Sequence, residues 1–427
     1  MHKIKTIAVI GLGYVGLPLA LLANKKGFEV YGLDIDLRKL DSLKKKRSYI
    51  DGVTDEDISN TVVKFTNDFS IIKKVDAAIV CVPTPVNREK IPDLNPVKGA
   101  VKGIAPFLKK RSLVVIESTV NPGVCDDIVA PLLEKYSKMK VGKDIYLAHC
   151  PERINPGDPN WDVSNINRVV GANSKKELDL AVNIYSQIID GTIKPMGNIK
   201  EAEAVKVVEN SFRDINIAFV NELAQSFHKL GINLENVIDG AATKPFAFMP
   251  HHPGCGVGGH CIPVDPYYLI QYASQNGFDH KFLKLARNIN ESMPQFTIDL
   301  LKEALDEINL PLKDARVALL GLSYKANIGD DRESPSYKII EIIEKAGVKL
   351  NIYDPYILDK STFKSLDSTL KDSTAIIIAT GHDEFKSITP SQLKESGAKI
   401  LIDGRNVFKN ESSSLEKVGI IYKGIGL

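Results

Sequence analysis

Three closely spaced glycines near the start of the chain constrain its fold more than any other feature. Gly11, Gly13 and Gly16 form a G-x-G-x-x-G motif. The apolar run Thr6–Ile10 before the motif predicts a strand, and the uncharged segment after it predicts a helix. A strand, a glycine turn and a helix in this order are typical of a dinucleotide-binding domain. The alternative is an ordinary tight turn between a strand and a helix.

An acidic residue further along favours the dinucleotide site. Asp34 ends a second predicted strand, Glu29–Leu33, at the distance expected for the acid that binds a ribose. A carboxylate there accepts hydrogen bonds from ribose hydroxyls and repels a 2′-phosphate, so the predicted cofactor is NAD rather than NADP. The predicted cofactor-binding residues in this region are Gly11, Gly13, Tyr14, Val15, Gly16, Asp34 and Arg38.

The rest of the chain falls into three regions. Apolar runs at Ala77–Val82, Leu113–Glu117 and Ile145–Ala148 predict further strands of a parallel sheet with helices on both faces. From Lys200 to about Leu230, apolar side chains recur at helical spacing and predict a long helix. The last region again predicts strands, at Arg316–Leu320, Lys349–Tyr353, Ala375–Ala379 and Lys399–Ile402.

This order predicts an α/β fold in which two Rossmann-like doubly wound domains are joined by a central all-helical domain. The predicted domains are residues 1–195, 196–300 and 312–427. A chain of 427 residues is long enough for two or three such cores.

Composition excludes several classes of protein. Lys and Arg number 55 and Asp and Glu 53, so no overall basic charge suggests a nucleic-acid partner. The uncharged N-terminal stretch is interrupted by the glycines and Pro18, which favours a strand–turn–helix over a secretory leader or a membrane span. Five irregularly spaced cysteines argue against a disulfide framework. We therefore expect a cytoplasmic protein without a nucleic-acid or membrane partner.

Two hydroxyl side chains follow predicted strands of the first region. Thr84 lies in Cys81-Val-Pro-Thr84-Pro and Thr119 in Glu117-Ser-Thr119-Val. Ligands of open α/β sheets bind outside the carboxyl ends of the strands, so both threonines are predicted to face the cofactor. Turn formation, which threonine and proline also favour, explains the same residues equally well.

The segment Gly254-Cys-Gly-Val-Gly-Gly259-His-Cys261-Ile-Pro-Val-Asp265 is the most unusual of the chain. Its glycines indicate a backbone that approaches a ligand closely or adopts positive φ. Cys261, at the exit of this loop, is a candidate nucleophile if a nearby charge lowers the pKa of its thiol. The alternative is a buried structural cysteine. The histidines and cysteines here match no usual zinc spacing, so no metal is expected.

Lys206 and Asn210 share one face of the predicted long helix, because they are four residues apart. A cation and an amide donor side by side can stabilise a developing oxyanion. A solvated helix surface is the alternative explanation for this pair.

Taken together, these residues resemble the UDP-glucose/GDP-mannose dehydrogenase family, over essentially the whole chain. The resemblance rests on Gly11–Gly16 with Asp34, Val82-Pro-Thr84-Pro, Glu117-Ser-Thr119, Pro151-Glu152-Arg153, Lys206 with Asn210, Gly258-Gly-His-Cys261-Ile-Pro-Val-Asp265, Tyr324-Lys325 with Asp330-Asp-Arg332-Glu-Ser-Pro335, and Asp403-Gly-Arg405-Asn. It implies an NAD-binding N-terminal domain, a central helical domain that forms a homodimer, and a C-terminal domain that binds a UDP-sugar.

The resemblance also implies roles for individual residues. Cys261 would carry a thiohemiacetal and then a thioester, and Glu152 would assist hydrolysis of the thioester beside Thr119. Lys206, Asn210 and Asp265 would stabilise the oxyanion and position the alcohol or water. The cofactor contacts implied in addition to the glycine motif are Thr84, Thr119 and Arg332. The substrate contacts implied are Glu152, Lys206, Asn210, Lys244, Gly256, Gly258, Lys325 and Arg405.

The implied reaction is a four-electron oxidation of the sugar C6 alcohol to a carboxylate, for surface polysaccharide or glycan precursors. Several segments, among them Arg47-Ser-Tyr-Ile50 and Lys244–Pro250, look most like UDP-N-acetylglucosamine 6-dehydrogenases. UDP-N-acetylmannosamine, UDP-N-acetylgalactosamine and UDP-glucose are the alternative substrates. A simple two-electron hydroxyacid dehydrogenase and an NAD-sensing binding module are alternatives from other classes.

Two positions depart from the pattern of many family members. Cys255 stands where many members have proline, and an inert packing role is expected for it rather than a redox role. Lys244 stands near the place of an arginine that reaches the partner subunit's sugar, and it lacks the planar fork of that side chain.

Overall fold

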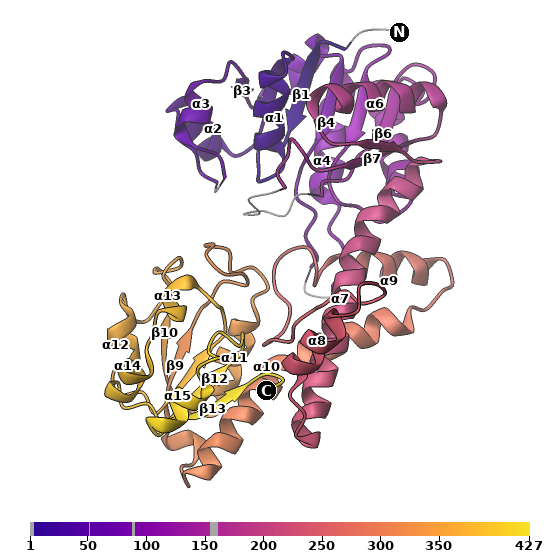
Figure 1. Cartoon of the computed structure of the whole chain (residues 1–427). Helices are drawn as coiled ribbons and strands as arrows, with labels where there is room; N and C mark the ends of the chain where they lie inside the picture. The colour runs from indigo at the N-terminus through magenta and orange to yellow at the C-terminus, as the bar shows by residue number, and fades with distance from the viewer. Residues whose placement is uncertain (1–3, 51, 88–89, 154–160) are drawn as a thin grey trace. The chain divides into compact units, whose positions relative to one another are not determined.

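The structure is a computed structural model that describes residues 4–50, 52–87, 90–153 and 161–427 (Figure 1). The chain divides into two compact units. The first comprises Met1–Glu209 with Tyr267–Phe278, and the second comprises Asn210–Pro266 with Asp279–Leu427. Helices α7 (Ile199–Leu230) and α9 (Asp265–Gln275) each contribute residues to both units.

The first unit is built on an eight-stranded sheet of strand order β3-β2-β1-β4-β5-β6-β7-β8. The strands are β1 (Thr6–Ile10), β2 (Glu29–Leu33), β3 (Lys64–Thr66), β4 (Ala77–Val80), β5 (Leu113–Ile116), β6 (Tyr146–His149), β7 (Arg168–Ala172) and β8 (Ile193–Pro195). Every pair is parallel except β6 with β7, which is antiparallel. The order reverses between β1 and β4, which is where ligands bind in such sheets.

Helices cover both faces of this sheet because its strands are apolar on both sides. Ile7 and Val9 of β1 belong to one buried cluster, together with side chains of α1 and α6, and Ala8 and Ile10 belong to the other, with those of α4 and α5. The helices of this unit are α1 (Gly16–Lys25), α2 (Leu37–Lys44), α3 (Asp55–Ser59), α4 (Asn95–Ile104), α5 (Ala130–Ser137), α6 (Lys175–Ile188) and most of α9 (Asp265–Gln275). Shorter helical turns lie at η1 (Phe69–Lys74), η2 (Ala105–Phe107) and η3 (Cys125–Val129).

The second unit holds a five-stranded parallel sheet of order β10-β9-β11-β12-β13. Its strands are β9 (Arg316–Leu320), β10 (Lys349–Tyr353), β11 (Ala375–Ile378), β12 (Ile400–Asp403) and β13 (Ile421–Gly424). Its helices, besides part of α7, are α8 (Leu234–Ala242), α10 (Lys281–Glu307), η4 (Leu312–Asp314), α11 (Pro335–Lys345), α12 (Leu366–Leu370), α13 (Asp383–Lys386), α14 (Pro390–Glu395) and α15 (Ser412–Lys417). Side chains of α7, α8 and α10 share one buried cluster with one face of the sheet.

The predicted fold class is confirmed, with local differences. The structure contains two mainly parallel sheets and a central helical region. β4 and β5 end earlier than predicted, before Cys81 and Glu117. Four strands were not predicted, namely β3, β7, β8 and β13, and β7 makes the first sheet mixed rather than purely parallel.

Candidate active site

The turn after β1 has the backbone that its glycines predict. Gly11 has φ +92°, and a Cβ there would lie 2.8 Å from the carbonyl oxygen of Cys81. A Cβ on Gly16 would lie 1.9 Å from the carbonyl oxygen of Gly11, so neither position can hold a larger residue. A Cβ on Gly13 would meet no atom of the described residues within 4 Å. The first and third glycines thus serve the turn and the packing of α1, and the middle one leaves room for a ligand.

Asp34 lies directly after β2, next to this turn. Its Oδ2 accepts the backbone N–H of Leu12 at 2.8 Å and lies 3.1 Å from Lys39 Nζ, and its Oδ1 accepts the N–H of Asp36 at 2.9 Å. The carboxylate is 8% exposed and is therefore fixed by the protein rather than by solvent. Its remaining lone pairs can accept ribose hydroxyls.

This arrangement fits NAD. The open space at Gly13, the start of α1 at Gly16 and the acid after β2 provide the pyrophosphate and ribose contacts of a dinucleotide. When bound, NAD supplies the hydride acceptor for an oxidation. Arg38 is paired with Asp36 and its side chain is 92% exposed, and Tyr14 is also exposed, so both stand at the surface of this site.

Replacement of Asp34 by alanine is expected to reduce the preference for NAD by about tenfold or more. The change removes the ribose acceptor and the charge that repels a 2′-phosphate, and it leaves Lys39 Nζ able to attract that phosphate. Titration calorimetry with NAD and NADP measures the ratio of dissociation constants. Asp41→Ala, which removes an exposed acid paired with Lys45 on the same α2, is the control. Equal affinity of the wild type for NAD and NADP would contradict the assignment.

A hydrogen bond joins the segments that follow β4 and β5, beside this turn. Ser118 Oγ donates to the carbonyl oxygen of Val82 at 2.7 Å. The half-buried Thr119 follows Ser118, and Thr84, also half-buried, accepts a hydrogen bond from Tyr268 Oη on its backbone carbonyl. The structure thus brings the two segments that contain Thr84 and Thr119 together at the carboxyl edge of the sheet. Sequence reasoning missed Tyr268, because nothing near it in the chain points to Thr84.

Glu152 and Lys206 are the other predicted catalytic residues of the first unit. Glu152 is buried, and its Oε1 accepts the backbone N–H of Arg153 at 2.6 Å. Lys206 on α7 is 9% exposed, and Asn210, one turn further along, is 5% exposed. Both helical residues are therefore buried, which overturns the alternative that they lie on a solvated helix surface.

Asn210 contacts a second predicted residue within the second unit. Its Nδ2 donates to Asp265 Oδ2 at 2.5 Å, and both side chains are buried. Asp265 is the first residue of α9, and its backbone N–H donates to the carbonyl oxygen of Cys261 at 2.8 Å. Cys261 itself is partly exposed. This turn places Cys261 four residues before the acid that accepts a hydrogen bond from Asn210.

The glycine loop before Cys261 packs closely against distant segments of the second unit. A Cβ on Gly258 would lie 2.6 Å from Tyr324 Cβ, and one on Gly259 would lie 2.8 Å from Tyr324 Cε2. The N–H of Gly259 donates to the carbonyl oxygen of Arg332 at 2.9 Å. A Cβ on Gly254 would lie 2.7 Å from Arg405 Nη1. Glycine is required at Gly258 and Gly259, because the Tyr324 segment occupies the space that their side chains would fill.

Two of the predicted substrate and cofactor contacts of the second unit, Arg332 and Arg405, lie against this loop. Lys325 follows Tyr324 in the chain, and Arg405 Nε donates to the carbonyl oxygen of Ala379 at 2.9 Å. Arg332 is paired with Asp330. Lys244 stands apart: its ammonium lies 4.8 Å from the centroid of the exposed Phe246 ring.

A buried polar network that was not predicted fixes the same loop. Asp214 on α7 pairs with Arg287 on α10, at 2.6 Å, and accepts from Asn290 Nδ2 at 2.8 Å. Asn221 Nδ2 donates to Asn290 Oδ1 at 2.9 Å, and Asn221 Oδ1 accepts the N–H of Gly254 at 3.0 Å. The helices therefore position the loop through side chains that no local motif singles out.

Cys255 is a packing residue in this structure. It is fully buried, and a Cβ on Gly404 would lie 2.0 Å from its Sγ. Burial raises the pKa of its thiol, although the charge of Arg405 opposes the shift. None of the five cysteines, all of which are among the described residues, forms a disulfide.

Oxidation is therefore expected to inactivate the wild type and Cys255→Ala at the same rate. A buried thiol with a raised pKa supplies little thiolate to react. The measurement is residual dehydrogenase activity after timed exposure to peroxide, with and without dithiothreitol. An activity loss that dithiothreitol restores in the wild type, and that is absent from Cys255→Ala, would contradict the packing role.

The second unit contains a glycine turn like the one after β1, but the acid that follows it is fully buried. Gly321 has φ +100° and its N–H donates to the carbonyl oxygen of Tyr353, as that of Gly11 does to Leu33. Asp354, at the place of Asp34, accepts the N–H groups of Leu322 and Ser323. His382 Nε2 lies 3.1 Å from the same carboxylate, which is fully buried and has its pKa lowered to about 2 despite its burial. No ribose can reach Asp354, so this turn is structural.

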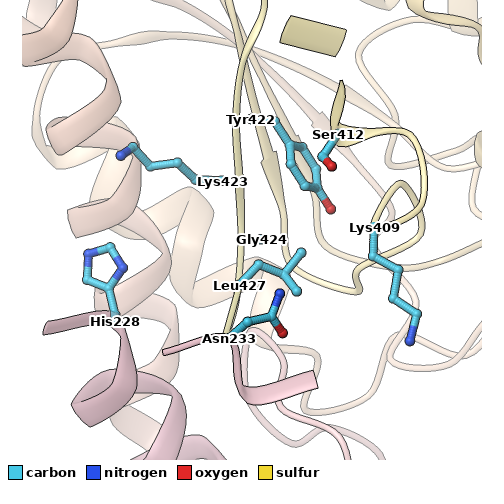
Figure 2. A pocket seen from close by; sticks show the side chains of 8 residues that line it. All are labelled: His228, Asn233, Lys409, Ser412, Tyr422, Lys423, Gly424 and Leu427. Atoms are coloured by element: carbon cyan, nitrogen blue, oxygen red, sulfur yellow. The ribbon is translucent and has the colours of Figure 1, made fainter. Parts of the chain in front are cut away.

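The second unit contains a pocket of about 270 Å³ whose lining includes none of the predicted site residues. Figure 2 shows the side chains that line it. Its lining residues are His228, Asn233, Lys409, Ser412, Tyr422, Lys423, Gly424 and Leu427. Each of its basic side chains has a carboxylate partner outside the lining: His228 pairs with Glu303, Lys409 with Glu235, and Lys423 with Glu307. Since these acids balance the basic groups, the pocket has no surplus positive charge for an anion.

No group of three or more His, Cys, Asp or Glu side chains in the part of the chain described above is arranged to hold a metal ion. Within the same residues, no helix combines the length and the apolar character needed to cross a bilayer.

Models of one protein family match three successive segments of the chain. The NAD-binding domain of the UDP-glucose/GDP-mannose dehydrogenase family matches residues 5–189. The central domain of that family matches residues 200–292, and its UDP-binding domain matches residues 318–410.

Similar proteins cover nearly the whole chain. A UDP-N-acetyl-D-mannosamine dehydrogenase of Pyrococcus horikoshii is 38% identical, over 98% of this chain and 99% of its own. A UDP-N-acetyl-D-glucosamine 6-dehydrogenase of Pseudomonas aeruginosa is 35% identical, over 96% of this chain and 98% of its own. A solved structure of the UDP-D-ManNAc dehydrogenase of Pyrococcus horikoshii matches with a TM-score of 0.92, 38% identity and 99% coverage of both chains.

Proposed function

Because the chain belongs to the UDP-glucose/GDP-mannose dehydrogenase family, we propose that it oxidises the C6 alcohol of a UDP-N-acetylhexosamine to the carboxylate. The single observation that carries the proposal is the packing of the Gly254–Gly259 loop, which leads to Cys261, against Tyr324 and Arg405. This close packing places the loop that leads to a candidate nucleophile against the domain that the UDP-binding family model matches. The alcohol-to-acid conversion removes four electrons, so two NAD are reduced per sugar.

The proposed chemistry uses Cys261 to retain the intermediate. The thiolate of Cys261 adds to the C6 aldehyde, which forms a thiohemiacetal, and loss of a second hydride leaves a thioester. Water then forms the new C–O bond as the C–S bond breaks, and the acid leaves while Cys261 is regenerated. A free aldehyde, which could diffuse away, is not needed in this sequence.

The remaining roles follow from charge and hydrogen-bonding capacity. Lys206 and Asn210 stabilise negative charge on the sugar oxygen, and Asp265, held by Asn210, positions the alcohol or water. Glu152 accepts the proton of the hydrolytic water, with Thr119 on the neighbouring strand end.

Binding of the substrate is assigned to the loop region of the second unit. Lys325 and Arg405 contact the nucleotide-sugar, and the backbone at Gly256 and Gly258 lies against it. Lys244 adds a positive charge, and Arg332 contacts the cofactor. The use of NAD and of a nucleotide-sugar fits a cytoplasmic enzyme that supplies precursors of surface polysaccharide or glycan.

A panel of UDP-sugars with purified protein tests the proposal. UDP-N-acetylglucosamine and UDP-N-acetylmannosamine are both included because the chain is 35% and 38% identical to enzymes named for these sugars. UDP-N-acetylgalactosamine and UDP-glucose complete the panel. Two NADH per sugar consumed is the expected result. One NADH per sugar would indicate a simple alcohol dehydrogenase, and no NADH with any sugar would support a binding module.

The protein is further proposed to be a homodimer through α7. Val208, Phe212 and Phe219 lie on one stripe of this helix, and each is about half-exposed. Exposed apolar side chains on one stripe are typical of a helix that pairs with another chain.

Light scattering at assay concentration is expected to give twice the chain mass of 47.0 kDa. Phe219→Asp should shift the protein towards the monomer, because it places a charge in the apolar stripe. Val237→Asp, which changes an exposed apolar residue of α8, is the control and should leave the mass unchanged. A fully active monomeric wild type would contradict the proposal.

A further inference from the structure

A buried arginine in the first unit lies between two carboxylates at the ends of adjacent strands. β5 and β6 are parallel, with Ile116 opposite His149, so Glu117 and Glu152 both leave the carboxyl edge of the sheet. β7 runs antiparallel to β6, with His149 opposite Gly171. Continuing this register places Arg168, the first residue of β7, opposite Glu152. Because β7 is antiparallel to β6, its first residue, Arg168, places a positive charge at this edge of the sheet.

The three side chains form one ion cluster. Arg168 Nη1 lies 3.1 Å from Glu117 Oε1, and Arg168 Nη2 lies 2.7 Å from Glu152 Oε2. The side chains of Arg168 and Glu117 are completely shielded from solvent, and that of Glu152 is 9% exposed. One cation thus serves two carboxylates in a region that water does not screen.

The surrounding groups cannot alter this balance of charge. Cys81 Sγ donates to Glu117 Oε2 at 3.1 Å, and Cys150 and Tyr185 also face the cluster. Burial raises the pKa of all three well above the ordinary values, so they remain neutral while the carboxylates titrate. Arg153 presents its backbone N–H to Glu152, while its guanidinium pairs with Glu209.

The two carboxylates therefore compete for a single compensating charge. Two ionised carboxylates beside one arginine leave a net negative charge in a buried site, which is costly. Burial raises the pKa of Glu117 to about 7; Arg168 opposes the shift and the charge of Glu152 adds to it. Near neutral pH, Glu117 thus changes between a neutral and a charged form while it remains bound to Arg168.

We propose that Arg168 and Glu117 are positioning residues for hydrolysis: Arg168 fixes the carboxylate of Glu152, and a negative charge on Glu117 competes for Arg168 and favours transfer of the water proton to Glu152. This inference rests on the proposed function, in which Glu152 accepts the proton of the hydrolytic water. When Glu117 is neutral, Glu152 does not compete with a second charged carboxylate for Arg168. When Glu117 ionises, it shares Arg168 and adds a negative charge close to Glu152.

Hydrolysis of the thioester needs no reactant other than water. One proton of the attacking water passes to Glu152, the water oxygen bonds to the thioester carbon, and the C–S bond breaks to release the Cys261 thiolate. Both hydride transfers precede this step, so a change at Glu117 or Arg168 affects hydrolysis selectively. A merely structural role would slow both stages together.

The test separates the two stages in a single turnover. Wild-type holoenzyme is mixed with UDP-N-acetylhexosamine and NAD over the pH range in which it stays folded. NADH absorbance reports hydride transfer, and intact-protein mass spectrometry of quenched samples reports the covalent adduct and its decay. For the wild type, adduct decay is expected to accelerate about three- to tenfold as the pH rises through about 7, in line with a stronger base.

Glu117→Gln should lose this acceleration while NADH formation is retained, because the amide cannot ionise. Glu177→Gln is the matched control: Glu177 is another buried glutamate of the first unit, which accepts the N–H of Leu147 outside the cluster. It should keep the wild-type pH profile. An unchanged profile in Glu117→Gln would overturn the inference.

Arg168→Lys is a second variant, which tests the inference even if Glu117→Gln does not fold. Lysine keeps the charge but cannot bridge two carboxylates as the guanidinium fork does. Adduct decay should slow about tenfold or more relative to NADH formation, and an equal loss in both stages would overturn the positioning role. Absence of any NADH with wild-type protein would instead reject the proposed function, which distinguishes the two failures.

Discussion

Glu152→Gln is expected to accumulate one sugar nucleotide covalently attached to Cys261. The amide has nearly the shape of the carboxylate, so binding and both hydride transfers should continue. The hydrolytic water then lacks its proton acceptor, and steady-state turnover should fall by about 10²–10⁴-fold. Intact-protein mass spectrometry after mixing with UDP-sugar and NAD should show the adduct, and hydroxylamine should remove it because it is a thioester.

Cys261→Ser is the counterpart of this variant. A serine alkoxide is harder to generate than a thiolate, and the resulting ester is hydrolysed less readily, so acid formation should cease. An adduct that maps to any residue other than Cys261 would reject the nucleophile. Wild-type turnover by Glu152→Gln would reject only the hydrolytic role and leave the cysteine chemistry in place.

Lys206→Met is expected to lower kcat by about 10²–10³-fold with a smaller change in KM. Lys206 is buried on α7, one turn before Asn210, where an ammonium stabilises charge more strongly than it would in water. Methionine retains much of the side-chain volume and removes the charge. Steady-state kinetics with the preferred UDP-sugar measures both constants.

Lys200→Met provides the control for this prediction, because Lys200 lies on the same helix with about half of its side chain exposed. It should leave kcat within about twofold of the wild type, as expected for an exposed charge. A Lys206→Met variant with unchanged kcat would show that the buried ammonium does not act on the reacting oxygen.

The features that the sequence predicted well are those whose cause lies within a short stretch of chain. Gly11 and Gly16 are needed by one turn, and Asp34 accepts an N–H of that same turn. Periodicity likewise predicted the long helix α7, because the spacing of its apolar side chains follows from helical geometry alone. The family resemblance that these motifs support is confirmed, as are the fold class and NAD.

Other features depended on segments far apart in the chain. The Tyr324 segment and the Gly258–Gly259 turn touch although they lie far apart in the sequence. Asn221 and Asn290 hold the same loop through hydrogen bonds between α7 and α10. No sequence pattern marked these asparagines, since an amide on a helix is usually exposed.

The amino-acid sequence by itself determined the dinucleotide turn, the order of sheet, helices and sheet, and the residue types available for chemistry. Only the tertiary structure determined which charged side chains contact one another where they are shielded from solvent. Arg168 begins a strand whose direction the sequence did not reveal, and reversal of that strand against β6 carries its guanidinium to Glu117 and Glu152. The physical reason is that side-chain identity fixes what a group can bind, whereas burial and strand direction fix its partner and hence its charge.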